Sequence, residues 1–407
     1  MAVLENRQTI VVIGTGYVGL PAALLLARAG HTVIGVDINE NIVRAINEGV
    51  LHLKEEELQA IMNEPEVRAN LRAQTTPAEA DVFLIAVPTP VDPRKKVAEM
   101  KYVREATESI TPYLRPGNLI ILESTVPPLT CRDFMSPILE KSGLKVGETL
   151  YLAHCPERIL PGDVFYEIVH NDRIIGAQDQ KARDLATAVY ATFVKGNLYQ
   201  TDDVTAELCK LMENTYRDVN IALANELAAV AENLGIDPFE AIELANKHRR
   251  VKILRPGIGV GGHCIPLDPW FIKEVDPENS RLIFTARLVN DEMPPKMAAK
   301  IRQALKDVPS PKIVAVGAAY KANTEDTRES PAVEIVRLLR ADGYDVTHYD
   351  PLVEKMRWPS GATLAEACAG ADLLAILIQH DVVMAELAET RPAIEAALRD
   401  GRILVFG

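Results

Sequence analysis

The feature that most constrains the fold lies near the N-terminus, where an apolar run leads directly into closely spaced glycines. Residues 9–13 (TIVVI) have the β-branched composition of a buried strand, and Gly14-x-Gly16-x-x-Gly19 follows them. The next residues, LPAALLLARAG, have helical apolar spacing, and a second strand-like run, HTVIGVD, ends at Asp37. This order predicts a βαβ unit whose glycines admit a pyrophosphate to the N-terminus of the helix.

The carboxylate of Asp37 stands where a dinucleotide fold places the ribose hydroxyls. Since it would repel a 2'-phosphate, it favours NAD over NADP as the cofactor. Tyr17 and Val18 lie between the glycines and complete the expected cofactor-binding turn. A plain βαβ turn with a capping aspartate is the simpler alternative.

Two further strand-like runs, 81–87 and 118–122, end in the polar segments VPTP and ESTVPP. Because the carboxyl ends of parallel strands face the ligand crevice, Thr89 and Thr125 are candidates for cofactor contact. Taken singly, each segment could be an ordinary turn.

The middle of the chain has the pattern of one long helix, residues 205–234, ended by Gly235 and an Asp-Pro pair. Strand and helix signals then alternate again, beginning with KIVAVG at 312–317. We therefore expect an α/β protein with two Rossmann-like doubly wound domains joined by a long central helix. The expected parts are an N-terminal NAD-binding domain (1–202), a central helical domain (203–307) and a C-terminal Rossmann-like domain (308–407).

Charge and cysteine content limit the partners. With 44 Lys and Arg against 57 Asp and Glu the net charge is −13, which argues against nucleic acid and against a polybasic membrane contact. No stretch has the ~20 apolar residues of a membrane span, and no secretion signal is apparent. The five cysteines form no C-x-x-C pair or metal-ligand spacing, so we expect a cytoplasmic protein without a metal.

One cysteine lies in an unusual setting, GIGVGGHCIPLDPWF at residues 257–271. Glycine backbone allows a ligand to come close to Cys264, and Asp268 follows one helical turn later. A zinc site would need more Cys or His than His263 supplies. A nucleophile is the favoured interpretation, and a packed structural thiol stays open.

Polar residues also recur along one side of the long helix at Lys210, Asn214, Arg217 and Asn225. A solvated face is the ordinary interpretation of such a stripe. A ligand-binding face is the alternative, because the helix connects two nucleotide-type domains.

Several of these motifs occur together in an order that resembles the UDP-glucose/GDP-mannose dehydrogenase family over nearly the whole chain. They are the glycine fingerprint, HCPERILPGD, ELCKLMENTYRDVNIALANEL, GIGVGGHCIPLDPWF and YKANTEDTRESPA. The resemblance implies oxidation of a sugar C6 alcohol to a carboxylate with two NAD+ and one water. Its catalytic residues here would be Cys264, Lys210, Asn214, Glu157, Asp268 and Thr125, with Cys264 forming a thiohemiacetal and then a thioester.

The resemblance also implies contacts with a UDP-sugar substrate and with NAD. The expected substrate residues are Arg158, Ile159, Lys210, Asn214, Arg217, His248, Arg250, Gly261, Tyr320 and Lys321, and Arg328 is expected to meet the NAD phosphates. A homodimer through the central helix is implied as well, with Arg250 reaching in from a neighbouring subunit.

CPERILPGD, NKHRRV and GGHC-x-x-x-DPWF look most like the members that act on UDP-N-acetyl-D-mannosamine. UDP-N-acetylglucosamine and UDP-glucose are the alternative substrates. A single-step hydroxy-acid-type dehydrogenase is a more remote alternative, and it would have no use for Cys264.

Overall fold

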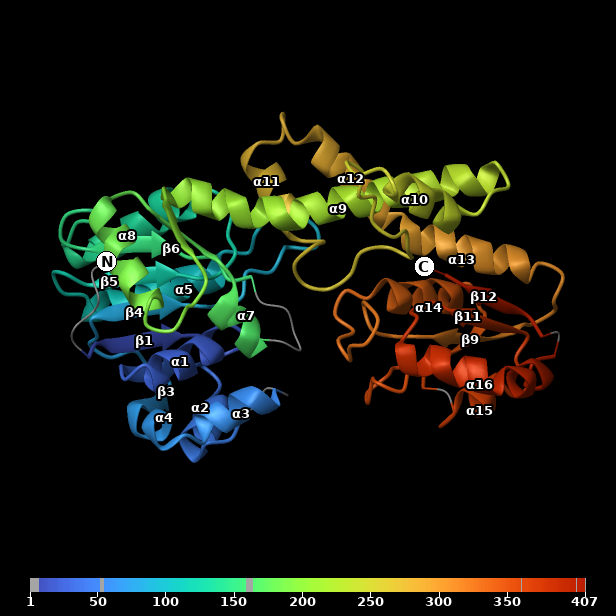
Figure 1. The fold of residues 1–407 in the computed structure, drawn as a ribbon, viewed down its shortest axis with the longest axis horizontal. Helices are drawn as coiled ribbons and strands as arrows, with labels where there is room; N and C mark the ends of the chain where they lie inside the picture. The colour runs from blue at the N-terminus through green and yellow to red at the C-terminus, as the bar shows by residue number, and fades with distance from the viewer. Residues whose placement is uncertain (1–6, 52–54, 159–163, 360, 400, 407) are drawn as a thin grey trace. The chain divides into compact units, whose positions relative to one another are not determined.

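The computed structural model describes residues 7–51, 55–158, 164–359, 361–399 and 401–406. They form two compact units. The first unit comprises Met1–Met212 and Trp270–Asp276, and the second comprises Glu213–Pro269 and Pro277–Gly407. The division falls within α9 (Asp203–Asn233), the long helix of Figure 1.

The first unit is built on an eight-stranded sheet of order β3-β2-β1-β4-β5-β6-β7-β8. Its strands are β1 (Thr9–Ile13), β2 (Thr32–Val36), β3 (Leu71–Gln74), β4 (Val82–Ile85), β5 (Leu119–Leu122), β6 (Tyr151–His154), β7 (Arg173–Ala177) and β8 (Leu198–Thr201). Its helices include α1 (Gly19–Arg28), α2 (Glu40–Glu48), α3 (Glu56–Met62), α4 (Pro65–Asn70), α5 (Lys101–Ile110), α6 (Ser136–Leu139), α7 (Val164–His170) and α8 (Gln180–Tyr190). The sheet order reverses between β1 and β4, which is the topological switch of a doubly wound fold.

Both faces of this sheet are buried. In β1, Ile10 and Val12 join one hydrophobic core cluster, and Val11 and Ile13 join another. Successive side chains of a strand point to opposite faces, so a continuous apolar run such as TIVVI fills two cores at once.

Two neighbouring strands, β7 and β8, depart from the parallel arrangement expected from the sequence. β7 pairs with β6 antiparallel, whereas β7 and β8 are parallel to each other. β3 and β8, with the sequences LRAQ and LYQT, were also not expected, because they lack an apolar run and lie at the sheet edges. Pairing to a neighbouring strand, not apolar composition, makes these segments strands.

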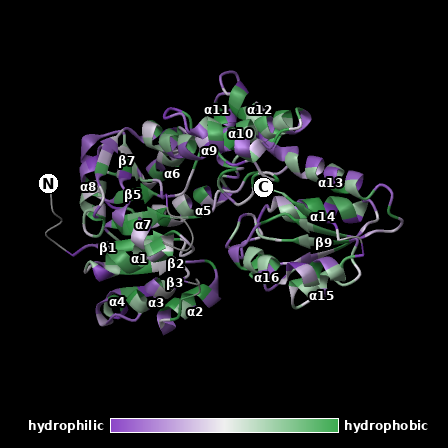
Figure 2. Ribbon diagram, turned by 45° about the vertical axis from the view of Figure 1, so that its right-hand side comes forward, coloured by the Kyte–Doolittle hydropathy of each residue, from purple (hydrophilic) through white to green (hydrophobic). Residues whose placement is uncertain are grey.

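The second unit holds a four-stranded parallel sheet of order β10-β9-β11-β12. Its strands are β9 (Lys312–Val316), β10 (Asp345–Tyr349), β11 (Leu373–Ile376) and β12 (Ile403–Val405), and its flanking helices are α14 (Pro331–Ala341), α15 (Leu364–Cys368) and α16 (Asp381–Ala397). Residues of β9 again alternate between two core clusters. In Figure 2 the region of β9 and α14 is accordingly hydrophobic.

Helix α9 has 31 residues, about 46 Å at ~1.5 Å per residue. It ends as predicted at Gly235, whose φ of +72° is left-handed. The helices after α9 are α10 (Pro238–Asn246), α11 (Asp268–Val275), α12 (Arg281–Asp291) and α13 (Met293–Ala304). Among the described helices, none has the length and apolar character to cross a bilayer.

Candidate active site

The three glycines between β1 and α1 have different roles. A methyl group on Gly14 (φ +87°) would lie 2.4 Å from the Ala86 carbonyl oxygen, and one on Gly19 would lie 1.9 Å from the Gly14 carbonyl oxygen. These two glycines let β1, β4 and α1 approach each other. Gly16 has no neighbouring atom within 4 Å of such a methyl group, so it borders open space.

Helix α1 starts without a side-chain cap, since its N-cap residue is Val18. The Leu20 N–H donates to the Gly16 carbonyl oxygen at 3.1 Å and Pro21 has no N–H, so an anionic ligand beside Gly16 would meet the Gly19 N–H and the positive end of the helix dipole. Tyr17 lies in the same turn, and its hydroxyl donates to Glu55 at 2.6 Å. Open space, an uncapped helix and close glycine packing together fit the pyrophosphate of a dinucleotide.

Asp37 follows β2 at the carboxyl edge of the sheet. Its Oδ2 accepts hydrogen bonds from the N–H and the hydroxyl of Thr15, each at 3.1 Å, and its Oδ1 accepts from the N–H of Asn39. These contacts hold the carboxylate beside the glycine turn, where it fits a ribose diol. Thr15, which sequence reasoning missed, stands between the first two glycines and is fully buried.

The polar segments after β4 and β5 lie together, because these two strands are neighbours in the sheet. Thr89 donates from Oγ1 to the Thr125 carbonyl oxygen at 2.6 Å. Ser124 accepts from the Val87 N–H at 2.9 Å and donates to the Val87 carbonyl oxygen at 2.7 Å. These bonds fix both strand ends at the edge that carries the glycine turn.

Glu157 is buried after β6. Its Oε1 accepts from the N–H of Arg158 at 2.7 Å, and its Oε2 accepts from the guanidinium of Arg173. The side chain of Arg158 turns instead to the carbonyl oxygen of Asp172. Ile159, also predicted to contact the substrate, lies outside the described residues.

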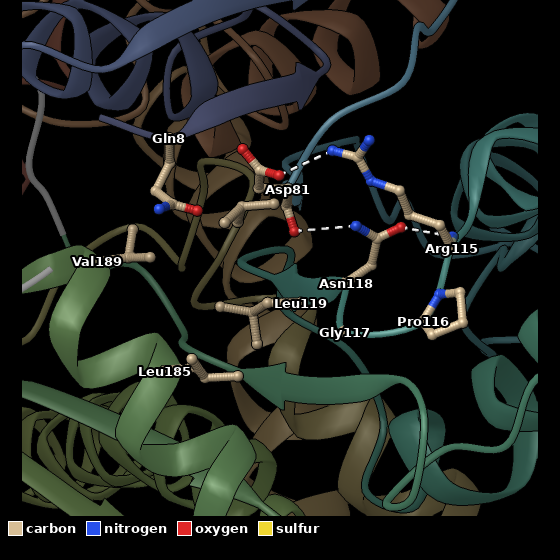
Figure 3. Close-up of a pocket in the computed structure, with 10 residues that line it drawn as sticks. Gln8, Asp81, Arg115, Pro116, Gly117, Asn118, Leu119, Leu185 and Val189 are labelled. Atoms are coloured by element: carbon tan, nitrogen blue, oxygen red, sulfur yellow. Dashed lines mark hydrogen bonds and ion pairs between the residues drawn. The ribbon is translucent and has the colours of Figure 1, made fainter. Parts of the chain in front are cut away.

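The described residues of the first unit line at least two cavities. One of about 310 Å³ is lined by Arg158, Asp172, Ile174, Tyr199, Thr201, Thr205 and Cys209. The other, of about 170 Å³, lies where β4 and β5 begin, and Asp81, Arg115 and Asn118 are hydrogen-bonded to one another in its wall (Figure 3). Ligands of open α/β sheets bind at the carboxyl ends of strands, so this second cavity is not the expected cofactor site.

In the second unit the cysteine loop is packed against the segment that follows β9. A methyl group on Gly261 would lie 2.6 Å from the Glu329 carbonyl oxygen, and one on Gly262 would touch the ring of Tyr320. The Gly262 N–H donates to the Arg328 carbonyl oxygen at 3.1 Å. The paired glycines therefore allow the loop to lie directly on this segment, with Cys264 partly exposed.

The residues after Cys264 lead into α11. The Cys264 carbonyl oxygen accepts from the N–H groups of Leu267 and Asp268, both at 3.0 Å. Asp268 is buried, and its Oδ2 accepts from the amide of Asn214 at 2.6 Å. The structure thus joins three of the predicted catalytic residues within the second unit.

The polar stripe on α9 is solvated only in part. Lys210 is partly buried, Asn214 and Asn225 are buried, and Arg217 is exposed. Asn225 accepts from the Gly257 N–H at 2.8 Å, which fixes the start of the cysteine loop.

A buried network behind this stripe escaped the sequence analysis. Asn225 donates to Asn290, Asn290 donates to Asp218 at 2.9 Å, and Arg287 forms an ion pair with Asp218. Burial raises the pKa of Asp218 to about 6, opposed by Arg287. The sequence shows these residues only as polar positions within helical segments. Their burial results from packing between α9 and α12, which the sequence pattern does not reveal.

The segment after β9 carries three further candidates, Tyr320, Lys321 and Arg328. Arg328 makes a two-pronged contact with Asp326, with its Nη2 2.7 Å from Oδ2, and this hydrogen bonding raises the pKa of Arg328. Burial raises the pKa of Tyr320, and the charges of Asp326 and Cys264 add to the effect.

Tyr320 therefore lies near Cys264, whereas Lys321 is exposed. His248 and Arg250 are exposed in a separate loop that Asn246 closes through two hydrogen bonds to Ile253.

Comparison with known proteins covers most of the chain. The NAD binding, central and UDP binding domains of the UDP-glucose/GDP-mannose dehydrogenase family match residues 8–194, 204–292 and 314–405. A UDP-N-acetyl-D-mannosamine dehydrogenase of Methanocaldococcus jannaschii is 50% identical over 92% of this chain and 86% of its own. An NDP-N-acetyl-D-galactosaminuronic acid dehydrogenase of Ralstonia nicotianae is 42% identical over 92% of this chain and 91% of its own.

Among solved structures, that of a UDP-D-ManNAc dehydrogenase from Pyrococcus horikoshii is similar, with a TM-score of 0.91 and 40% identity. The match covers 98% of this chain and 95% of that one. The NAD cofactor expected from the glycine turn and Asp37 is confirmed by the matched NAD binding domain. With all three of its domains present in order, the chain belongs to the UDP-glucose/GDP-mannose dehydrogenase family, whose members are NAD-dependent nucleotide-sugar dehydrogenases.

Proposed function

We propose that the protein oxidises the C6 hydroxyl of UDP-N-acetyl-D-mannosamine to the carboxylate, with Cys264 as a covalent nucleophile. The observation that carries the proposal is the Cys264 loop, whose glycines rest on the matched UDP binding domain and whose Asp268 is bonded to Asn214. The names of the relatives support this choice of sugar.

The reaction removes two electron pairs from one carbon. NAD, when bound, accepts hydride. Lys210, with Asn214 and Asp268, handles the proton of the alcohol as the aldehyde forms. The Cys264 thiolate adds to the aldehyde carbonyl to give a thiohemiacetal, and loss of a second hydride and a proton leaves a thioester.

Water then hydrolyses the thioester. Glu157 takes a proton from the water, its oxygen bonds to the acyl carbon, and the bond to the Cys264 sulfur breaks. Thr125 helps to place the water. The covalent step keeps the half-oxidised sugar bound between the two oxidations.

The remaining predicted residues are proposed to hold the two nucleotides. Gly14, Gly16, Tyr17, Val18, Gly19, Asp37, Thr89 and Arg328 would bind NAD. Arg158, Ile159, Arg217, His248, Arg250, Gly261, Tyr320 and Lys321 would bind the UDP-sugar, since guanidinium and ammonium groups suit a diphosphate.

We also propose a homodimer formed through the central helix. Large apolar side chains recur along α9 and the turn after it at intervals of three, four or seven residues and are exposed: Tyr216, Leu223, Leu227, Val230 and Leu234. A contiguous exposed apolar stripe of this kind favours packing against a second helix.

The substrate is tested by measuring kcat/KM for UDP-N-acetyl-D-mannosamine, UDP-N-acetylglucosamine, UDP-glucose and GDP-mannose, and by counting NADH per sugar. We expect the mannosamine derivative to have the highest kcat/KM, with two NADH for each sugar consumed. A higher kcat/KM for another sugar would reassign the substrate, and one NADH per sugar would support a single-step dehydrogenase.

A further inference from the structure

The reversed strand β7 places an arginine at the carboxyl edge of the sheet. Its antiparallel register pairs Ala153 with Ala177 and His154 with Gly176, and continuing that register brings Arg173 opposite Glu157. Arg173 Nη2 donates to Glu157 Oε2. In a parallel strand the first residue would lie at the opposite edge.

A second carboxylate faces the same guanidinium. Glu123 Oε1 lies 3.6 Å from Arg173 Nη1, and this oxygen accepts a hydrogen bond from the Tyr190 hydroxyl at 2.6 Å. Side-chain exposure is 4% for Arg173, 0% for Glu123 and 7% for Glu157. The rings of Tyr190 and Phe193 cover the guanidinium, with centroids 4.8 and 5.8 Å away.

One buried positive charge is thus shared by two buried carboxylates, and the sharing is unequal. Glu157 is within hydrogen-bonding distance of Arg173, whereas Glu123 makes only the longer ion-pair contact. Two like charges around a single cation in a poorly solvated site raise each other's proton affinity. A change of charge on Glu123 must therefore change the proton affinity of Glu157.

Burial raises the pKa of Glu123 from 4.5 to about 7. The Arg173 charge opposes the rise, the Glu157 charge adds to it, and the Tyr190 hydrogen bond opposes it. Cys155, which follows β6, is the other titratable group that faces Glu123, and burial keeps its thiol neutral by raising its pKa well above its ordinary value. Near neutral pH, Glu123 is therefore divided between its protonated and ionised forms.

We propose that Glu123 and Tyr190 act through Arg173 as a positioning network that sets how strongly Glu157 takes a proton from the hydrolytic water. With Glu123 protonated, Arg173 acts on Glu157 alone and weakens it as a base. With Glu123 ionised, Arg173 is shared, the two carboxylates repel, and Glu157 becomes a stronger base. The inference rests on the proposed role of Glu157 in thioester hydrolysis.

The test measures the rate of thioester hydrolysis as a function of pH. Enzyme, NAD+ and UDP-N-acetyl-D-mannosamine are mixed rapidly and quenched with acid, and the acylated fraction is followed by intact-protein mass spectrometry. The wild-type rate should rise through an inflection near pH 7, the pKa of Glu123. Glu123→Gln should lack this inflection and should hydrolyse the thioester more slowly than wild type well above it, because Arg173 then acts on Glu157 alone.

Glu207→Gln is the matched control. Glu207 is also a buried carboxylate of the first unit whose pKa burial raises to about 7, but its partners are the N–H groups of Leu129 and Cys131. Glu207→Gln should keep the wild-type inflection in the rate of thioester hydrolysis, because Glu207 is bonded to Leu129 and Cys131 and not to Arg173. Loss of the inflection in Glu207→Gln as well would overturn the assignment to Glu123.

Tyr190→Phe provides a second probe if Glu123→Gln folds poorly. It removes the hydrogen bond that favours ionised Glu123, so the inflection should move to higher pH. An unmoved inflection would contradict the network.

Glu157→Gln separates the two proposals. Wild-type hydrolysis in that variant would refute the role of Glu157 itself. Slow hydrolysis in Glu157→Gln together with a wild-type pH profile in Glu123→Gln would refute only the network.

Discussion

Replacing Gly261 by alanine tests whether the cysteine loop must lie directly on the segment after β9. The added methyl group would lie 2.6 Å from the Glu329 carbonyl oxygen, 2.7 Å from Pro331 Cδ and 2.8 Å from Tyr320 Cβ. None of these atoms is the end of a flexible side chain, so the loop or the segment must move. Gly261 does not have a left-handed φ, so the effect of the substitution is steric.

Gly257→Ala is the control, since its methyl group would have no neighbour within 4 Å and its φ is also not left-handed. Overpacking of this kind costs about 1–3 kcal/mol of folding free energy. A displacement of Cys264 by ~1 Å can lower kcat by ~100-fold. We therefore expect Gly261→Ala to unfold at lower urea concentration, to change the alkylation rate of Cys264 by iodoacetamide and to lose most activity. Equal stability, alkylation and kcat in the two variants would refute the packing described for this loop.

Four further outcomes are expected. Cys264→Ser should abolish net formation of the carboxylate but leave UDP-sugar affinity, measured by calorimetry, nearly unchanged; full steady-state activity would exclude the covalent step. Gly16→Ala should fold normally, because its methyl group enters open space, yet weaken NAD binding at least tenfold, and unchanged affinity would move the pyrophosphate elsewhere. Leu227→Glu should dissociate the proposed dimer in light scattering, and an unchanged mass would exclude α9 as its interface. Between pH 4.5 and about 7 the folded protein holds the Glu123 proton more tightly than the unfolded chain does, so the free energy of unfolding should fall as pH rises. Glu123→Gln should lack the contribution of Glu123 to this fall. The same pH dependence of the free energy of unfolding in wild type and Glu123→Gln would contradict the raised pKa of Glu123.

Local patterns in the sequence were enough to predict the elements that carry the cofactor turn and the cysteine loop. The strand TIVVI, the glycine turn and the stop at Gly235 are each determined by residues close together in the sequence. The structure confirms β1, α1 and the end of α9. The sequence predicted Thr89 and Thr125 only as separate candidates for cofactor contact, and their hydrogen bond depends on the adjacency of β4 and β5.

The antiparallel direction of β7 was not predictable from NDRIIGA, because strand direction is set by the chain's path between β6 and β7. Arg173 therefore escaped notice, although it is buried against Glu157. The buried partners Asp218 and Arg287 are 69 residues apart, and no local pattern joins such a pair. Polar residues in helices show their role only when packing removes them from water.

The most direct measurement is identification of the acylated residue during turnover. The enzyme is quenched while oxidising UDP-N-acetyl-D-mannosamine and digested, and the peptides that contain Cys264 and Cys209, both partly exposed, are compared by mass spectrometry. The account predicts a uronyl adduct on Cys264 and none on Cys209. The account would be contradicted if wild type makes two NADH per sugar while Cys264 carries no adduct in wild type or in Glu157→Gln, the variant in which hydrolysis should be slow.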